Sequence, residues 1–302
     1  MEIGPHNVPC VVAEIGCNHK GDVEVAKEMI RVAASFCGVD VVKFQKRCPR
    51  ELLTPQQYAA PHPVPANSYG KTYGEHREAL EFDVEVHREL KRACEAAGVT
   101  YACSTWDMTS AREIASLEPA YIKIPSACNT HVEMLSWLLD NYAGALHVSL
   151  GMTTREEEGR LLALFRERGR VNDLVLYACT SGYPVAVEDI CLLEIDRLRV
   201  SYGAEVGAIG FSGHHLGIAP DIAAVTLGAA WVERHFTLNR AWKGTDHAAS
   251  LEPDGMRRLA RDIRNVATAL TYKPQAILAV EQAQRAKLKW RPRPALVDGA
   301  AA

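Results

Sequence analysis

The sequence predicts an α/β fold, a (β/α)₈ TIM barrel in a single domain. Short apolar segments alternate along the chain with segments of helical spacing, which is typical of parallel strands joined by right-handed crossovers. Eight such repeats occupy about 270 residues, the usual size of a closed eight-stranded barrel. No Gly-x-Gly-x-x-Gly follows the first strand, which disfavours the competing architecture, a doubly wound open sheet.

The eight predicted strands are short and rich in apolar and β-branched residues. They are assigned to residues 8–16, 39–45, 99–105, 120–126, 145–151, 173–180, 205–213 and 229–236. Helices are expected at 24–36, 84–97, 110–116 and 253–270. Ser110 with Glu113, and Thr153 with Glu156, have the spacing of a capping box, so each pair is expected to begin a helix. The barrel is expected to span 1–272, followed by a helix and tail at 273–302 that are too short for a second domain.

Composition and charge narrow the class of protein. The formal net charge is −3 and no long basic stretch occurs, which argues against nucleic acid as a partner. No apolar run reaches the roughly 18 residues of a membrane span, and the N-terminus lacks a signal-peptide pattern. The nine cysteines include no Cys-x-x-Cys pair, and an odd number favours reduced thiols. We therefore expect a cytoplasmic protein with neither a membrane nor a nucleic-acid partner.

Polar side chains gather at the predicted carboxyl ends of the strands, which converge on the catalytic face of a barrel. Two of them, Lys43 and Lys123, suit a phosphate or a carboxylate. A single lysine there could simply extend to the rim, but a pair favours anion binding. His214 and His235 end adjacent strands and suit a divalent metal or acid–base chemistry. His215 follows His214 directly and is expected to point elsewhere.

Long motifs resemble one known family. They are AEIGCNHKGD, VVKFQK, GKTYGEHREALEF, IKIPSACN, SLGMTT, CTSGYP, GFSGHHLG, ERHFTL and WKGTDHAASLEP. In this order they resemble the sialic acid synthase family over residues 8–272. The resemblance implies a TIM-barrel transferase that condenses phosphoenolpyruvate with an N-acetylmannosamine-like aldose, or its 6-phosphate, to give a nonulosonic acid and phosphate. It also implies a homodimer.

The resemblance assigns roles to individual positions. The implied phosphoenolpyruvate site comprises Lys43, Thr105, Lys123, Ser126, Ser149 and Ser212, with Ser181 where the family has asparagine. The implied sugar site comprises Glu14, Gln45, Asn67, Tyr183 and Asp246. The implied metal ligands are His214 and His235. Mn²⁺ or Mg²⁺ suits such an open site, and Zn²⁺ or Co²⁺ also fits it. The metal is expected to polarise the aldehyde, and Glu14 is the nearest candidate for activating water.

Further departures separate this chain from the family pattern. Cys128 stands where the family usually has a carboxylate. The sequence ends without the family's C-terminal antifreeze-like domain, which lends an arginine to the partner subunit's sugar site. We therefore expect the long stretch 46–82, rich in Pro, Tyr and Gly, to be an irregular loop that covers the aldose with Asn67 and Tyr69.

Three other functions remain open from the sequence. A related 3-deoxy-ulosonate synthase would use another aldose on the same site. A metal-dependent sugar isomerase would need a carboxylate-rich metal site, which the pair of Lys43 and Lys123 disfavours. A sugar-binding pseudoenzyme would have lost its chemistry, which the intact lysines and histidines disfavour.

Overall fold

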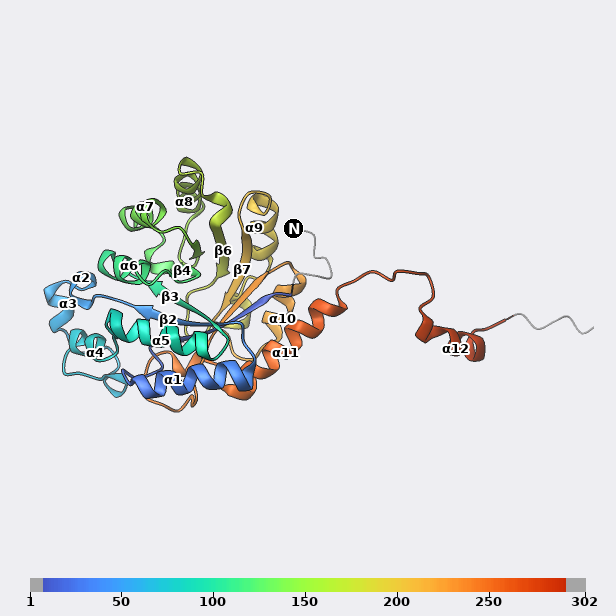
Figure 1. The fold of residues 1–302 in the computed structure, drawn as a ribbon, viewed down its shortest axis with the longest axis horizontal. Helices are drawn as coiled ribbons and strands as arrows, with labels where there is room; N and C mark the ends of the chain where they lie inside the picture. Colours follow the sequence, from blue (N-terminus) through green and yellow to red (C-terminus); the bar gives the residue numbers. More distant parts are fainter. Residues whose placement is uncertain (1–7, 292–302) are drawn as a thin grey trace, which may run out of the picture.

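Eight parallel strands close into a barrel in the computed structural model, which describes residues 8–291 (Figure 1). The strands are β1 Cys10–Gly16, β2 Val41–Lys46, β3 Thr100–Thr105, β4 Tyr121–Ile124, β5 Ala145–Ser149, β6 Leu174–Cys179, β7 Ala208–Gly213 and β8 Trp231–His235. Each pairs in parallel with the next, and β1 pairs with β8 to close the barrel. The predicted TIM barrel is confirmed, and the open-sheet alternative is excluded.

Helices surround the strands (Figure 1). They are α1 Val23–Arg31, α5 Val84–Ala96, α6 Met108–Ala115, α7 Val132–Asn141, α8 Arg155–Glu167, α9 Leu193–Tyr202, α10 Ala219–Thr226 and α11 Pro253–Ala269. A π-helix, Val32–Cys37, extends α1. In α11 the buried residues Met256, Leu259, Ala260 and Ile263 recur at the spacing of one helical face, so the helix buries an apolar stripe against the barrel.

Both predicted capping boxes are wrong in register. Helix α6 is capped by Asp107, whose carboxylate accepts the backbone N–H of Ser110 at 2.7 Å. Helix α8 is capped by Thr154 in a capping box with Glu157, one residue beyond the predicted pair. Adjacent threonines and three consecutive glutamates satisfy the pattern in more than one register, and the structure uses the second threonine.

The stretch 46–82 is more regular than predicted. It contains the short helices α2 Pro49–Leu52, α3 Pro55–Ala59 and α4 Tyr73–Ala79, and a 3₁₀ turn at Pro65–Asn67. Helices α2 and α3 begin with proline, whose fixed φ suits the first turn. Thr72 and Glu75 form a capping box on α4. The expectation of an irregular loop overlooked these local signals.

The C-terminal region leaves the barrel after α11. Helix α12, Ala279–Leu288, has no buried residue, and Figure 1 shows it projecting away from the barrel. Residues 292–302 of the predicted tail lie outside the described residues. Between residues 8 and 291, no helix combines the length and the apolar character that crossing a membrane requires.

Strand alternation decides which side chains enter the barrel. On β1, Val12 belongs to a small cluster inside the barrel, whereas Val11 and Ala13 belong to the larger core between strands and helices. Because alternate residues of a strand share a face, Glu14 points inward above Val12. The barrel floor is therefore apolar except for buried His147, whose ring stacks on Tyr121 at 3.7 Å. The polar side chains of the site lie above this floor, at the carboxyl ends of the strands.

Candidate active site

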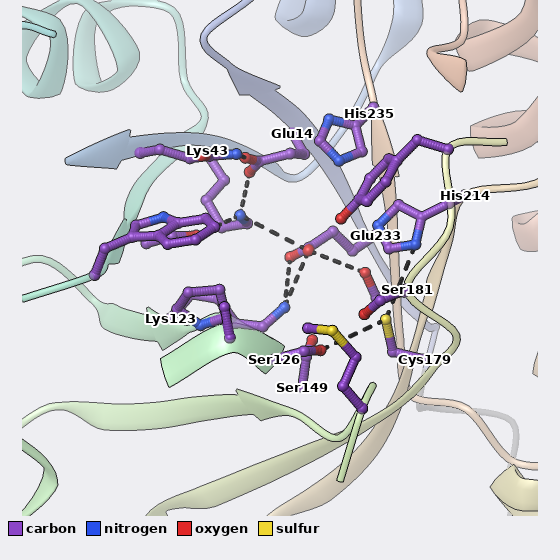
Figure 2. A pocket seen from close by; sticks show the side chains of 18 residues that line it. Glu14, Lys43, Lys123, Ser126, Ser149, Cys179, Ser181, His214, Glu233 and His235 are labelled. Carbon is purple, nitrogen blue, oxygen red and sulfur yellow. Dashed lines mark hydrogen bonds and ion pairs between the residues drawn. The ribbon is translucent and has the colours of Figure 1, made fainter. Parts of the chain in front are cut away.

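A cavity of about 270 Å³ opens at the carboxyl ends of the strands. Every strand, or the residues directly after it, contributes to its lining (Figure 2). The residues are Glu14, Lys43, Gln45, Ser104, Trp106, Lys123, Pro125, Ser126, Ala127, Ser149, Met152, Cys179, Ser181, Tyr183, Ser212, His214, Glu233 and His235. Eleven of the fourteen predicted site residues are among these, so the expected catalytic face is where the cavity lies.

Four buried charged groups form the base of the cavity. Lys123 Nζ lies 3.0 and 3.1 Å from the two carboxylate oxygens of Glu233. Lys43 Nζ lies 3.7 Å from Glu233 and forms a closer ion pair with Glu14 (Figure 2). Lys43 also donates to Ser104 Oγ at 2.7 Å. Buried charges are tolerated when they are paired in this way, and the two lysines are thus held ready for an anion.

The two carboxylates of this cluster have opposite pKa shifts. Burial raises the pKa of Glu14 to about 6, although Lys43 opposes the rise. Burial would also raise the pKa of Glu233, but attraction to Lys123 and Lys43 outweighs it and lowers the pKa to about 2. Two carboxyl groups whose environments separate their pKa values in this way commonly have different roles. Glu14 is the one placed to exchange a proton near neutral pH.

Hydroxyl groups surround the lysine side of the cavity. In Figure 2, Lys123 lies between Glu233 and the group formed by Ser126 and Ser149. Ser126 Oγ accepts the backbone N–H of Gly151 at 3.0 Å. A Cβ at Gly151 would lie 2.4 Å from Ser181 Oγ and 2.8 Å from Ser126 Oγ, so only glycine leaves these hydroxyls in place. Serine hydroxyls beside a lysine suit a phosphate or a carboxylate.

Two histidines face each other on the opposite wall. The rings of His214 and His235 have centroids 5.4 Å apart. His214 Nδ1 lies 2.9 Å from the carbonyl oxygen of Thr180, to which it can only donate, so Nε2 keeps its lone pair. Burial lowers the pKa of His235 and favours its neutral form, and its Nδ1 has no hydrogen-bond partner among the described residues. The Tyr183 ring lies close to both, tilted by 52° with its centroid 4.4 Å from that of His214, and edge-on to His235 at 5.9 Å.

These imidazoles fit a divalent metal in part. Metal-binding histidines commonly donate their other ring N–H to a carbonyl, as His214 does. Within residues 8–291, however, no group of three or more His, Cys, Asp or Glu side chains is placed to hold a metal ion. The protein would therefore supply two nitrogen ligands, and water or substrate oxygens would complete the coordination.

Three predicted site residues do not line the cavity. Thr105 is fully buried at the end of β3, and its hydroxyl has no hydrogen-bond partner within the described part of the chain. Asn67 lies in the 3₁₀ turn of the 46–82 stretch. Asp246 follows β8 and is close enough for its charge to oppose the lowering of the pKa of His235. None of these three residues forms part of the cavity wall.

His215 lies apart from the cavity lining, as expected. Its Nε2 is 3.1 Å from Asp221, and Arg234 bonds to Asp221 and to the backbone carbonyl of His215. All three side chains are buried. This network joins the loop after β7 to β8. It therefore holds in place His215 and Arg234, which are next to His214 and His235 in the chain.

Sequence reasoning missed Glu233, the central carboxylate of the cluster. It also missed several other lining residues: Trp106, Pro125, Ala127, Met152 and Cys179. A signal for Glu233 was present, because it precedes His235 by two positions on the same strand. Strand alternation places both on one face. The inward direction of His235 therefore implies the inward direction of Glu233.

Comparison with known proteins identifies the family. A sequence profile described as the NeuB family matches residues 29–275. The chain is 36% identical over 286 residues to the N-acetylneuraminate-9-phosphate synthase of Homo sapiens, covering 93% of this chain and 76% of that protein. It is 30% identical over 261 residues to the N,N'-diacetyllegionaminic acid synthase of Campylobacter jejuni, covering 86% and 77%.

A solved structure agrees with the fold. The N-acetylneuraminic acid synthetase of Leptospira borgpetersenii, crystallised with citrate, superposes with a TM-score of 0.78 at 24% identity and covers 94% of both chains. At this identity the likeness supports the barrel alone. The profile match and the 36% identity to the human synthase support more: this chain belongs to the NeuB family.

Proposed function

We propose that this chain condenses phosphoenolpyruvate with an N-acylated aldose to give a nonulosonic acid and inorganic phosphate. The observation that supports it best is the pair of buried lysines, Lys43 and Lys123, at the base of a cavity whose opposite wall carries two imidazoles. One end of the cavity suits an anion and the other suits a metal-bound oxygen donor. The relatives' names include synthases of both a nonulosonic acid and a nonulosonic acid phosphate.

The lysines hold phosphoenolpyruvate in this proposal. Lys123 and the hydroxyls of Ser126 and Ser149 take one anionic group, and Lys43 takes the other. Because the site is buried, these charge-assisted contacts act in a medium of low effective dielectric, where they are stronger than in water. Positioning and fixed charge then supply much of the rate enhancement.

The histidines serve the aldose. His214 and His235 would hold a divalent cation, which we propose to be Mn²⁺ or Mg²⁺, with Zn²⁺ or Co²⁺ also compatible. When bound, such a cation acts as a Lewis acid toward the aldehyde oxygen. Tyr183 lies beside His214 and His235 and forms a wall against which the sugar rests.

Glu14 is proposed to take the proton of water. C3 of phosphoenolpyruvate forms a bond to the aldehyde carbon as the π bond of the aldehyde breaks, so the aldehyde oxygen takes the electron pair and a proton, and positive charge develops at C2. Water adds at C2 as Glu14 accepts one of its protons. The C–O bond to phosphate then breaks, and the C2 hydroxyl gives up its proton to leave a ketone and inorganic phosphate. Gln45 donates to Glu14 at 2.7 Å and holds the carboxylate in place. The pKa of about 6 leaves Glu14 ionised at neutral pH and able to act as a base.

Release of inorganic phosphate tests the reaction. The purified chain is assayed with phosphoenolpyruvate, Mn²⁺ and a panel of aldoses that includes N-acetylmannosamine and its 6-phosphate. We expect phosphate release that needs an aldose and the cation, and loss of at least about 100-fold in kcat/KM for Lys123→Met. Release without any aldose, or no effect of Lys123→Met, would contradict the proposal.

The setting of the enzyme is also a proposal. Nine free cysteines support a reducing compartment such as the cytoplasm. We propose a homodimer, which light scattering of the purified chain would test. The 46–82 stretch reaches the loop after β8, because the Tyr69 hydroxyl donates to the carbonyl oxygen of Lys243 at 2.5 Å. This contact supports a cover over the aldose formed by the two loops.

A further inference from the structure

A second cavity of about 240 Å³ adjoins the lysine side of the central one. Its wall includes Arg47, Trp106 and Ala127, which follow β2, β3 and β4. Lys43 belongs to the first of these strands and Lys123 to the last. The two cavities share Trp106 and Ala127. Because Ala127 is small and exposed, no bulky side chain closes the shared edge at that point, and an anion held by the lysines has this cavity as its neighbour.

The wall of the second cavity combines positive charge with apolar surface. Arg47 and Arg77 carry the charge, and the other lining residues in the described part of the chain are Pro49, Leu52, Leu53, Trp106, Ala127 and Cys128. Burial raises the pKa of Cys128 to about 12, so its thiol is neutral. Apolar walls lower the effective dielectric and strengthen a contact between a guanidinium and an anion. The cavity therefore has the composition of an anion site.

The two arginines differ in how far their charge is neutralised. Arg47 is buried, lies 3.4 Å from Glu81 and stacks over the Trp106 ring at 4.5 Å. Arg77 is half-buried and donates from Nε and Nη2 to the hydroxyl of Tyr73. A hydroxyl satisfies these two donors without supplying a negative charge. Arg77 therefore keeps its charge, and its Nη1 remains able to donate.

Three carboxylates lie near the second cavity without lining it. Glu81 pairs with the buried arginine. Asp107 is the N-cap of α6, and Asp246 is close enough to His235 to influence its pKa. No ion pair joins Arg77 to any carboxylate within residues 8–291. An anionic ligand would therefore neutralise a charge that the protein itself leaves unpaired.

We propose that the second cavity receives inorganic phosphate after the C–O bond of the intermediate breaks, and holds it before it leaves the protein. The inference rests on the proposed function, which releases phosphate at the lysines. Phosphate oxygens match the fork of a guanidinium. Transfer from Lys123 to Arg77 exchanges one charge-assisted contact for another, so the anion leaves the buried lysines without first losing every partner.

Equilibrium dialysis with radiolabelled inorganic phosphate counts the sites. The wild type should bind two phosphates per chain, one at the lysines and one at Arg77. Arg77→Gln and Lys123→Met should each bind one. Phosphoenolpyruvate should displace the phosphate that remains in Arg77→Gln, because that phosphate lies at the lysines. A single phosphate on the wild-type chain, or two on Arg77→Gln, would overturn the inference.

Product inhibition supplies a kinetic readout. Inorganic phosphate is added while phosphoenolpyruvate is varied, and double-reciprocal plots give one inhibition constant from the slope and one from the intercept. The wild type should show both effects, because phosphate can occupy the second cavity while phosphoenolpyruvate occupies the lysines. Arg77→Gln should raise the intercept constant by at least about tenfold, the loss of one charge-assisted contact. The slope constant and KM for phosphoenolpyruvate should change less than about twofold. Equal changes in both constants, or no change in either, would contradict the proposed site.

Two further variants control for packing. Arg50→Gln removes an exposed arginine of the same stretch, which pairs with Glu78 at 3.1 Å and lines neither cavity. It should bind two phosphates and keep both inhibition constants. Arg77→Lys should retain the second site at lower affinity, because it keeps the charge and loses the fork. A site lost equally in Arg77→Lys and Arg77→Gln would assign the effect to packing and overturn the role of the charge.

Phosphate binding separates this inference from the proposed reaction, because dialysis requires no turnover. Two sites on a wild-type chain that releases no phosphate from phosphoenolpyruvate with any aldose would reject the reaction and retain the anion site. Turnover by a wild-type chain that binds a single phosphate would retain the reaction and reject the second site.

Discussion

Replacing Glu233 with glutamine removes the charge that holds two buried ammonium groups. Lys123 Nζ lies 3.0 Å and Lys43 Nζ 3.7 Å from its carboxylate. Removing one partner of a buried ion pair costs about 3–5 kcal/mol, because the remaining charge is left unpaired. The loss of stability has an upper bound, because a lysine left without its partner can release its proton and become neutral. Deprotonating a lysine of ordinary pKa at pH 7.5 costs about 4 kcal/mol. We therefore expect Glu233→Gln to lower the free energy of unfolding by about 3–4 kcal/mol.

Thermal unfolding followed by circular dichroism measures this loss. With an unfolding entropy of about 2.1 cal/mol/K per residue over 302 residues, the expected fall in Tm is about 5–6 °C. Burial already lowers the pKa of Lys123, and loss of Glu233 lowers it further. The folded variant then binds fewer protons than the unfolded chain, so the deficit in stability should shrink as the pH rises from 7.5 toward 9.

Phosphoenolpyruvate should partly replace the missing carboxylate. Its anionic groups meet lysines that lack one counter-charge, so the ligand should raise the Tm of Glu233→Gln more than that of the wild type. Glu156→Gln is the control, since Glu156 pairs with Arg160 at 2.8 Å on the surface, and such pairs contribute about 0–1 kcal/mol. A Tm for Glu233→Gln equal to that of the control, at both pH values, would refute the assigned role of Glu233.

Three further predictions concern the histidines, the proton acceptor and the outer barrel. His214→Ala should lower kcat/KM by about 100-fold or more in phosphate-release assays titrated with Mn²⁺. His215→Ala should keep the cation dependence of the wild type. Equal losses in the two variants would contradict the assignment of His214, rather than His215, as the metal ligand. The pKa of Glu14 is about 6 and its ionised form is the base, so kcat/KM should fall as the pH drops below about 6. Glu14→Gln should abolish this acidic fall in the pH profile. An acidic fall that persists in the variant would exclude Glu14 as the base. Glu158 accepts two hydrogen bonds of 2.8 Å from Arg197, which outweigh burial and lower its pKa. Glu158→Gln should therefore lower the free energy of unfolding by about 1–3 kcal/mol at pH 7. In urea titrations the difference from wild type should shrink as the pH falls below 4.5, because the unfolded chain then binds the proton more readily than the folded protein.

The sequence by itself determined the architecture and the face that carries the site. Apolar runs of strand length alternate with amphipathic helices, and these are local periodicities that any stretch of chain expresses without its neighbours. Eight repeats leave the closed barrel as the consistent arrangement. Strand-end positions then placed Lys43, Lys123, His214 and His235 on one face, and all four line the cavity.

The sequence predicted helix boundaries and short helices less well, because more than one local pattern fits the same residues. Two adjacent threonines precede α8, and the structure uses Thr154 where Thr153 was predicted. In the stretch 46–82, turn-forming residues concealed three short helices, which are too short to show a full apolar period. Their existence depends on caps and on packing against one another more than on periodicity.

Only the tertiary structure decided which charges meet. Glu233 and Lys123 are 110 positions apart, and no local pattern relates them. Barrel closure joins β1 to β8 and turns both side chains inward at the same level, and that geometry converts two unrelated residues into a buried pair. The same holds for the second cavity of about 240 Å³, which is lined by Arg77 from α4 and by Trp106 after β3. Secondary-structure periods are properties of neighbouring residues, whereas distances between distant side chains are fixed only when the chain has closed on itself.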